Sequence, residues 1–165
     1  MREVSLDDRE AILQNYGDSA VTEYFMEPLG TLEQAEAIAD EYAGCFRKGT
    51  GIVWAITLQG DDALVGTCGY EVLSKPDRRG EIGFDLGRPY WGRGLMQEAL
   101  RAAIGYGFEC LDLNRVEAYV LAENTRSIRV LKSLHFETEG VLREHRWFKG
   151  RLWDNVVMAL LKKEW

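Results

Sequence analysis

Residues 81–108 read EIGFDLGRPYWGRGLMQEALRAAIGYGF and predict three consecutive elements. The apolar alternation at the start is typical of a strand, and the alanine-rich segment from Leu95 onwards repeats with helical spacing. Gly92 and Gly94 lie in a turn between the two. Such a turn presents free backbone N–H groups and the positive end of the helix dipole, so it is suited to bind an anion, most often a phosphate.

The turn does not match the two commonest phosphate-binding motifs. A Walker loop is excluded because no Gly-Lys-Ser/Thr follows. Gly92 and Gly94 supply the first half of a dinucleotide fingerprint, but Gln97 stands where the third glycine belongs. Either another phosphate-bearing ligand binds here, or the glycines only connect strand and helix.

The chain before residue 81 predicts two helices followed by a β-hairpin. The expected elements are a helix capped by Ser5 and ending near Tyr16, a loop or broken helix over residues 18–30, a helix from Thr31 to about Gly49, and strands at 52–58 and 63–73 joined by Gly60-Asp61-Asp62. In the loop, Tyr24, Phe25 and Met26 either line a pocket or form a hydrophobic flap over the core.

The chain after residue 108 predicts a strand, a short helix and a final hairpin. The expected bounds are 116–121 for the strand, 124–135 for the helix, and 138–148 and 152–161 for the hairpin strands, with the turn at Lys149-Gly150. A helix joins the strands at 81–86 and 116–121, so these two should pair in parallel. The pattern is that of a mixed α/β protein and, at 165 residues, of a single domain over 1–165.

The composition restricts the function classes. Asp and Glu number 27 against 20 Lys and Arg, and the net charge of −7 argues against nucleic acid as a partner and suits a cationic substrate. Cys45, Cys68 and Cys110 are far apart, so neither a zinc site nor a disulfide framework is indicated. No signal core or membrane-spanning run is present, and we expect a cytoplasmic protein without membrane contacts.

Several short motifs, in the same order along the chain, resemble the GNAT superfamily of acyl-CoA N-acyltransferases, and more narrowly its branch of bacterial ribosomal-protein N-terminal acetyltransferases. They are EIGFDL at 81–86, WGRGLMQEA at 91–99, NRVEAYV at 114–120, ENTRS at 123–127 and FETEGVLR at 136–143. The resemblance covers nearly the whole chain. It implies a central mixed, mostly antiparallel sheet of about six or seven strands with flanking helices.

The resemblance also implies the ligand of the glycine turn, namely the pyrophosphate of acetyl-CoA. The residues expected to hold it are Trp91, Gly92, Arg93, Gly94, Leu95 and Met96. Of the superfamily signature Q/R-x-x-G-x-G/A, which falls on Trp91, Gly94 and Met96, only Gly94 matches. Backbone N–H groups do the binding, so the chemistry survives these departures. Arg93 and Arg88 either contact phosphate oxygens or are ordinary surface arginines.

For the rest of the donor, the resemblance implies that the strands at 81–86 and 116–121 splay apart and that the pantetheine arm fills the gap. Backbone groups near Phe84 and Leu86 would pair with the pantetheine amides. Asn124 matches an asparagine of the family that contacts pantetheine, and Ser127 matches a serine near the thioester sulfur.

The implied reaction needs a base, an oxyanion donor and a proton for the leaving thiolate. Many members of the superfamily use a tyrosine as the acid, but Leu131 stands at that position, so we assign the role to Ser127; alternatively, Ser127 only bonds local backbone. Glu81 is the first candidate for the base, followed by Glu144, His145 or water. His135 replaces a glycine of the family, and we assign it no catalytic role.

The sequence thus predicts an acetyl-CoA-dependent N-acetyltransferase that needs no metal and acts on a primary amine, either a protein N-terminus or a small amine. The alternative is a catalytically weak acyl-CoA-binding regulatory module. The loop at 18–30 and the final hairpin should shape the acceptor pocket, and the apolar hairpin makes a homodimer plausible.

Overall fold

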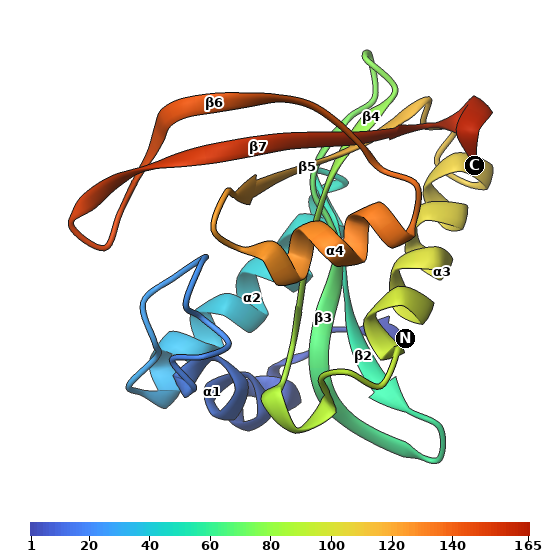
Figure 1. Ribbon diagram of the computed structural model, residues 1–165. Helices are drawn as coiled ribbons and strands as arrows, with labels where there is room; N and C mark the ends of the chain where they lie inside the picture. Colours follow the sequence, from blue (N-terminus) through green and yellow to red (C-terminus); the bar gives the residue numbers. More distant parts are fainter.

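A seven-stranded sheet forms the centre of the computed structural model, which describes residues 1–165 (Figure 1). The strands are β1 Arg2–Glu3, β2 Ile52–Leu58, β3 Asp61–Ser74, β4 Arg79–Leu86, β5 Arg115–Leu121, β6 Glu137–Phe148 and β7 Arg151–Leu161. The helices are α1 Arg9–Gly17, α2 Leu32–Lys48, α3 Leu95–Glu109 and α4 Thr125–Ser133, with short 3-10 turns at Leu6–Asp8, Arg88–Tyr90 and Lys162–Glu164. The strand order is β1-β2-β3-β4-β5-β7-β6, and only β4 and β5 are parallel.

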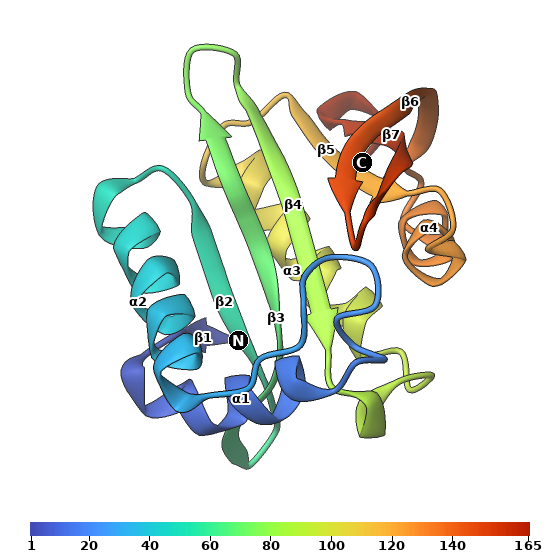
Figure 2. The same ribbon diagram turned by 90° about the vertical axis from the view of Figure 1, so that its left-hand side faces the viewer.

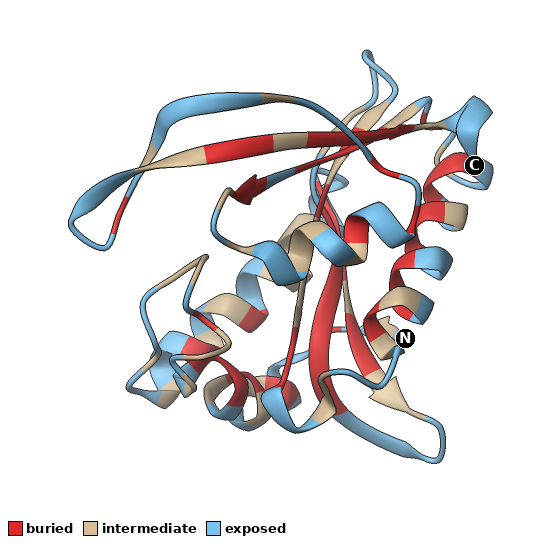
Figure 3. Ribbon diagram, viewed as in Figure 1, coloured by how far each residue is buried: buried red, intermediate tan, exposed pale blue.

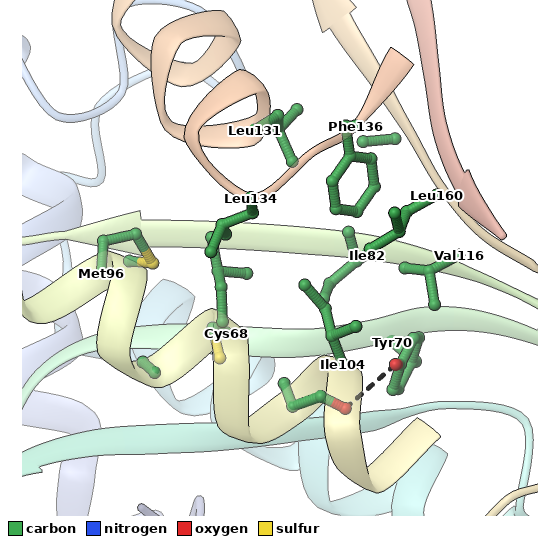
Figure 4. Packing of buried hydrophobic residues seen from close by; sticks show 14 of the residues in the cluster. Cys68, Tyr70, Ile82, Met96, Ile104, Val116, Leu131, Leu134, Phe136 and Leu160 are labelled. Atoms are coloured by element: carbon green, nitrogen blue, oxygen red, sulfur yellow. Dashed lines mark hydrogen bonds between the residues drawn. The ribbon is translucent and has the colours of Figure 1, made fainter. Parts of the chain in front are cut away.

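The helices cover both faces of the sheet. Helices α1 and α2 lie on one face, and α3 with α4 lies on the other (Figures 1 and 2). Each face therefore has its own hydrophobic cluster, a larger one under α3 and α4 and a smaller one under α1 and α2. In the larger cluster the hydroxyl of Tyr70 donates to Ala103 O at 3.0 Å, which satisfies a polar group in an otherwise apolar layer (Figure 4).

Local sequence signals account for the ends of several elements. Thr31 caps α2 by accepting a hydrogen bond from Gln34 N at 3.4 Å, and Gly49 ends the helix in the left-handed conformation at φ +66°. Lys149 and Gly150 both have positive φ, as the two-residue turn of the β6–β7 hairpin requires. These turns and caps agree with the predicted bounds.

The sheet divides between β4 and β5. The two strands pair only at Arg79↔Arg115, Gly80↔Val116 and Glu81↔Glu117, and then separate (Figure 2). Glu117 is 4% exposed at this point; its carboxylate accepts from Arg79 Nη1 and, at 2.7 Å, from Arg115 Nε. A buried carboxylate held by two guanidinium groups fixes the end of the pairing, because freeing any partner would leave a buried charge uncompensated.

The loop at 18–30 reaches across to the final hairpin. Arg146 Nη2 on β6 donates to Phe25 O at 2.6 Å, and Lys149 Nζ lies 3.3 Å from both Thr22 O and Glu23 O. Figure 2 shows this loop between the free end of β4 and the hairpin tip, whereas β6 is mostly exposed in Figure 3. The loop and the hairpin together close one side of the gap in the sheet.

The predicted fold class is confirmed, with the antiparallel run of β2, β3 and β4, the parallel pair β4–β5 and the four helices in their expected places. Two details were wrong. Asp61 and Asp62 begin β3 instead of forming the hairpin turn, because Leu58 pairs with Asp61 and the reversal takes place at Gln59 and Gly60, with Gly60 at φ +82°. The two-residue strand β1 was not predicted, since a single pair of residues carries no periodicity.

Candidate active site

Two adjoining cavities, of about 450 and 490 Å³, occupy the gap where β4 and β5 separate. The first reaches the glycine turn, and the second lies against β3, β4 and β5 below the hairpin. Residues that line both cavities are Tyr24, Phe25, Phe84, Asp85, Asn124 and Ser127. Ligands in the two cavities would therefore meet beside β4 and the start of α4.

The glycine turn forms the far end of the first cavity. Gly92 and Gly94 have φ of +70° and +79°, and Gly94 is the N-cap of α3. A Cβ atom at either glycine would meet nothing within 4 Å, so glycine is favoured there for its backbone conformation and not for lack of space. Gly94, Leu95, Met96 and Gln97 line this cavity, and the N–H groups of the first turn of a helix have no partner within it, so this end of the cavity is suited to an anion.

Trp91 connects this turn to both walls of the gap. Its Nε1 donates to Leu86 O at 2.6 Å, and the guanidinium of Arg126 on α4 lies 4.3 Å from its ring centroid. Arg126 also pairs with Glu23 at 3.0 Å. Arg126 and Arg129 both line the first cavity and place two cations opposite the anion-binding turn.

Asn124 and Ser127 form the junction of the cavities on the α4 side. Asn124 Oδ1 caps α4 by accepting from Ser127 N at 3.2 Å, which orients both side chains at the helix start. On the facing strand, Phe84 lies beyond Glu81, the last residue of β4 that pairs with β5. The edge of β4 that faces β5 is therefore available to an extended ligand.

Three carboxylates line the second cavity, from Glu71, Glu81 and Asp85. Burial, followed by the nearby charge of Glu117, raises the pKa of Glu81, and Arg79 opposes this shift. Burial raises the pKa of Asp85 to about 6, although Tyr16 and Thr67 donate hydrogen bonds to its Oδ2. A carboxylate with a raised pKa is a better proton acceptor than one in water.

The chain matches the family model described as acetyltransferase (GNAT) domain over residues 1–137. It belongs to the GNAT family.

Relatives of this GNAT chain carry the same activity in their names. The uncharacterized N-acetyltransferase p20 of Bacillus licheniformis is 39% identical over 166 residues, which span 100% of this chain and 93% of p20. The [ribosomal protein uS5]-alanine N-acetyltransferase of Escherichia coli is 36% identical over 84 residues, which span 51% of this chain and 43% of that one. The GNAT chain is accordingly an N-acetyltransferase.

Solved structures agree with this fold. A GNAT-family acetyltransferase from Bacillus anthracis superposes with a TM-score of 0.87 at 27% identity and covers 99% of this chain and 94% of its own. RimL, a ribosomal L7/L12 alpha-N-protein acetyltransferase in complex with coenzyme A, superposes with a TM-score of 0.89 at 18% identity, over 97% of this chain and 92% of its own.

The GNAT site brings together most of the residues predicted to hold the donor. Those that line the first cavity are Phe84, Leu86, Trp91, Gly92, Gly94, Leu95, Met96 and Asn124. Arg93 lies outside the lining, with its guanidinium 5.9 Å from the Tyr90 ring centroid, and Arg88 pairs with Asp18 at 3.2 Å. Arg126 was missed, although it stands within the ENTRS motif between the two residues that were assigned.

The candidate bases of the GNAT site differ in their access to the second cavity. Glu81 and His145 line it, and His145 Nδ1 lies 3.3 Å from Asn155 Nδ2. Glu144 lies outside both cavities and donates its backbone N–H to Asp154. Glu71 and Asp85 were missed; alternation along β4, which places residues 81, 83 and 85 on one face, could have indicated Asp85.

The structure also shows where the remaining residues singled out in the GNAT sequence lie. Leu131, at the position of the absent tyrosine, is completely buried in the larger cluster. His135 has φ +67°, the left-handed conformation that a glycine adopts readily, so the turn is kept despite the substitution. In the loop, Tyr24 and Phe25 line the cavities, and Met26 packs against the smaller cluster.

No group of three or more His, Cys, Asp or Glu side chains is arranged to hold a metal ion. None of the helices has the length and apolar character needed to cross a membrane.

Proposed function

We propose that this acetyltransferase moves the acetyl group of acetyl-CoA to a primary amine, either a protein N-terminal amine or a small amine. The observation that carries the proposal is the meeting of the two cavities at Phe84, Asn124 and Ser127. One cavity ends in an anion-binding turn, and the other contains carboxylates. A phosphate-bearing donor and an amine acceptor suit these two halves.

The donor would lie with its pyrophosphate on the N–H groups at Gly94 and the start of α3. Arg126 and Arg129, across the first cavity, supply positive charge for the phosphate oxygens. The pantetheine arm would run along the open edge of β4 past Phe84 and reach Asn124. RimL, whose fold this chain shares, was solved in complex with coenzyme A, which supports a coenzyme A donor for this chain.

The chemical step would take place beside Ser127. Glu81, whose pKa is raised, accepts a proton from the ammonium directly or through water. The free amine nitrogen then forms a bond to the acetyl carbonyl carbon, and backbone N–H groups of β4 stabilise the oxyanion. When the C–S bond breaks, the electron pair remains on sulfur and the Ser127 hydroxyl donates a hydrogen bond to the departing thiolate. The proton that the bound nitrogen loses as the amide forms passes through water to the thiolate, which leaves as the free thiol.

Both kinds of acceptor have support. The name of the uS5-alanine acetyltransferase, a relative, favours a protein N-terminus. The carboxylates Glu71, Glu81 and Asp85 favour a cationic amine of any size. The alternative function, a catalytically weak acyl-CoA-binding regulatory module, is favoured only by Leu131 at the tyrosine position.

The test is an acetyl-CoA assay that follows release of the free thiol. The purified protein is incubated with acetyl-CoA and a panel of N-terminal peptides, polyamines and aminoglycosides. Thiol release that depends on an added amine, with the acetylated amine detected by mass spectrometry, supports the enzyme. Tight acetyl-CoA binding without turnover on any amine would establish the regulatory module instead.

A further inference from the structure

The three carboxylates of the second cavity form a row along one face of β4. Side chains at 81, 83 and 85 point to the same face, and successive positions on a strand face are about 7 Å apart. Position 83 is a glycine, and a Cβ atom built there would lie 2.0 Å from Glu71 Oε1 and 2.6 Å from Glu71 Cδ. The Glu71 carboxylate therefore occupies the space above Gly83, between Glu81 and Asp85.

Glu71 lies at a bulge in the neighbouring strand, β3. Tyr70 pairs with Ile82 and Val72 pairs with Glu81, so Glu71 is the additional residue at the register shift. Alternation along β3 places Glu71 on the same face as Thr67 and Gly69, which pair with Asp85 and Gly83. This position and the space left free by Gly83 together bring the third carboxylate into the row.

The protein supplies little positive charge to the row. Of the two arginines whose charges reach it, Arg79 is paired with Glu117, and Arg146 donates to Phe25 O, so one unpaired guanidinium faces three carboxylates. Asp85 Oδ1 is buried and has no hydrogen-bond partner. A buried carboxylate oxygen without a partner is costly, so the site is suited to a ligand that brings a cation and N–H donors.

The walls of the second cavity suit the ammonium groups and the methylene chain of such a ligand. The aromatic residues that line it are Tyr16, Tyr24, Phe25, Tyr42 and Tyr119. Aromatic faces attract ammonium groups and pack against methylene chains. His145 and Arg146 are the only basic residues that line this cavity.

We propose that the acceptor is a small linear amine with a second ammonium group, and that Glu71, over Gly83, binds this second ammonium with the help of Asp85. The amine to be acetylated then reaches Glu81 and the junction at Ser127. A carbon chain spanning about 7 Å, the spacing of two positions on the strand face, connects the two nitrogens. This inference rests on the proposed acetyl transfer and names its acceptor class.

The test compares acceptors that differ only at the far end, namely diaminobutane, aminobutanol and butylamine. A hydrogen-bonded ammonium–carboxylate contact predicts that kcat/KM for diaminobutane exceeds that for butylamine by about 10- to 100-fold. In Glu71→Gln this preference should fall to within about threefold, because KM rises more for diaminobutane than for butylamine. Glu109→Gln, the same change at an exposed residue outside both cavities, should keep the full preference.

A second variant tests the placement of Glu71 without altering its charge. In Gly83→Ala the new methyl group must displace the Glu71 carboxylate, so the preference for diaminobutane should fall here too. Equal kcat/KM for the three acceptors in the wild type would overturn the inference while leaving the acetyl transfer intact. A clear preference for N-terminal peptides over diaminobutane would do the same.

A binding measurement distinguishes a failure of this inference from a failure of the proposed function. If no amine releases thiol, the proposed acetyl transfer fails. Calorimetric titration of diaminobutane into the protein saturated with coenzyme A then tests whether the row of carboxylates binds the diamine. Binding that Glu71→Gln weakens about tenfold or more supports the ammonium site, and equal or absent binding in the two proteins overturns it.

Discussion

Tyr16 donates a hydrogen bond of 2.7 Å to Asp85, and this bond links helix α1 to the C-terminal end of β4. Both side chains line the second cavity, and the Tyr16 hydroxyl also lies 3.2 Å from Tyr42 and from Thr67. The group that faces the acceptor is therefore part of a hydrogen-bonded network that joins α1, α2 and β3 on one face of the sheet. Changes in the charge of Asp85 should affect both stability and binding.

We predict that replacing Asp85 with Asn changes the pH dependence of stability. The folded pKa of about 6 exceeds the ordinary value of 3.8, so the unfolded state loses this proton first as the pH rises. Stability therefore falls between about pH 4 and pH 6, by about 2–3 kcal/mol at most. In Asp85→Asn this fall should disappear, which urea unfolding at several pH values measures. Parallel curves for the two proteins would contradict the assignment.

Replacing Gly94 with Val should weaken coenzyme A binding at least about tenfold, because a β-branched residue at φ +79° strains the turn. The fold should remain, since the turn is exposed. Gly140→Val is the matched control, because position 140 has open space and no positive φ. Calorimetry and circular dichroism give the two readouts. Unchanged affinity in Gly94→Val would refute the placement of the pyrophosphate.

Removing the Arg126 guanidinium should weaken coenzyme A binding about tenfold, since a cation beside the phosphates and a contact with the Trp91 ring are both lost. The loss should be smaller at high salt, because screening already reduces the electrostatic part. Arg143→Ala, an exposed arginine outside both cavities, serves as the control in calorimetric titrations. Equal losses in the two variants would argue against a specific role.

Ser127→Ala should lower kcat about tenfold or more and leave KM nearly unchanged, because the hydroxyl acts on the leaving thiolate and not on substrate binding. Ser133→Ala, at the other end of α4, removes a hydroxyl that only bonds Val130 O at 2.7 Å and should keep full activity. Steady-state kinetics measures both. A change confined to KM would make Ser127 a binding residue.

Glu81→Gln should lower kcat/KM about 100-fold and remove a limb of the pH profile. The raised pKa of Glu81 means that activity should rise with pH above the usual titration range of a glutamate, as the carboxylate forms. The variant, which has no group to ionise there, should lack this rise. A profile that keeps its limb in Glu81→Gln would move the role of base to His145 or to water.

The sequence predicted the donor half of the site better than the acceptor half for a physical reason. Strand, glycine turn and helix at 81–108 are consecutive, and their signals are local periodicity and backbone conformation. Glu71 on β3 comes near Asp85 through the pairing of β3 with β4 and through the space left by Gly83 on β4, and the register of two paired strands cannot be read from either strand alone. Arg126 reaches Trp91 across the gap between β4 and α4, and no spacing within the chain indicates that contact.

The early end of the β4–β5 pairing has a further consequence. A sheet that divides after Glu81↔Glu117 has a free strand edge in its interior, where most sheets have edges only at their margins. Free edges invite pairing with strands of other molecules, and proteins commonly protect them with charged side chains and short lengths. Here the free segment, residues 82–86, is short, with Glu81 directly before it and Asp85 within it. We therefore expect the same acidic side chains that are suited to an amine to protect the empty enzyme against aggregation through its own active site.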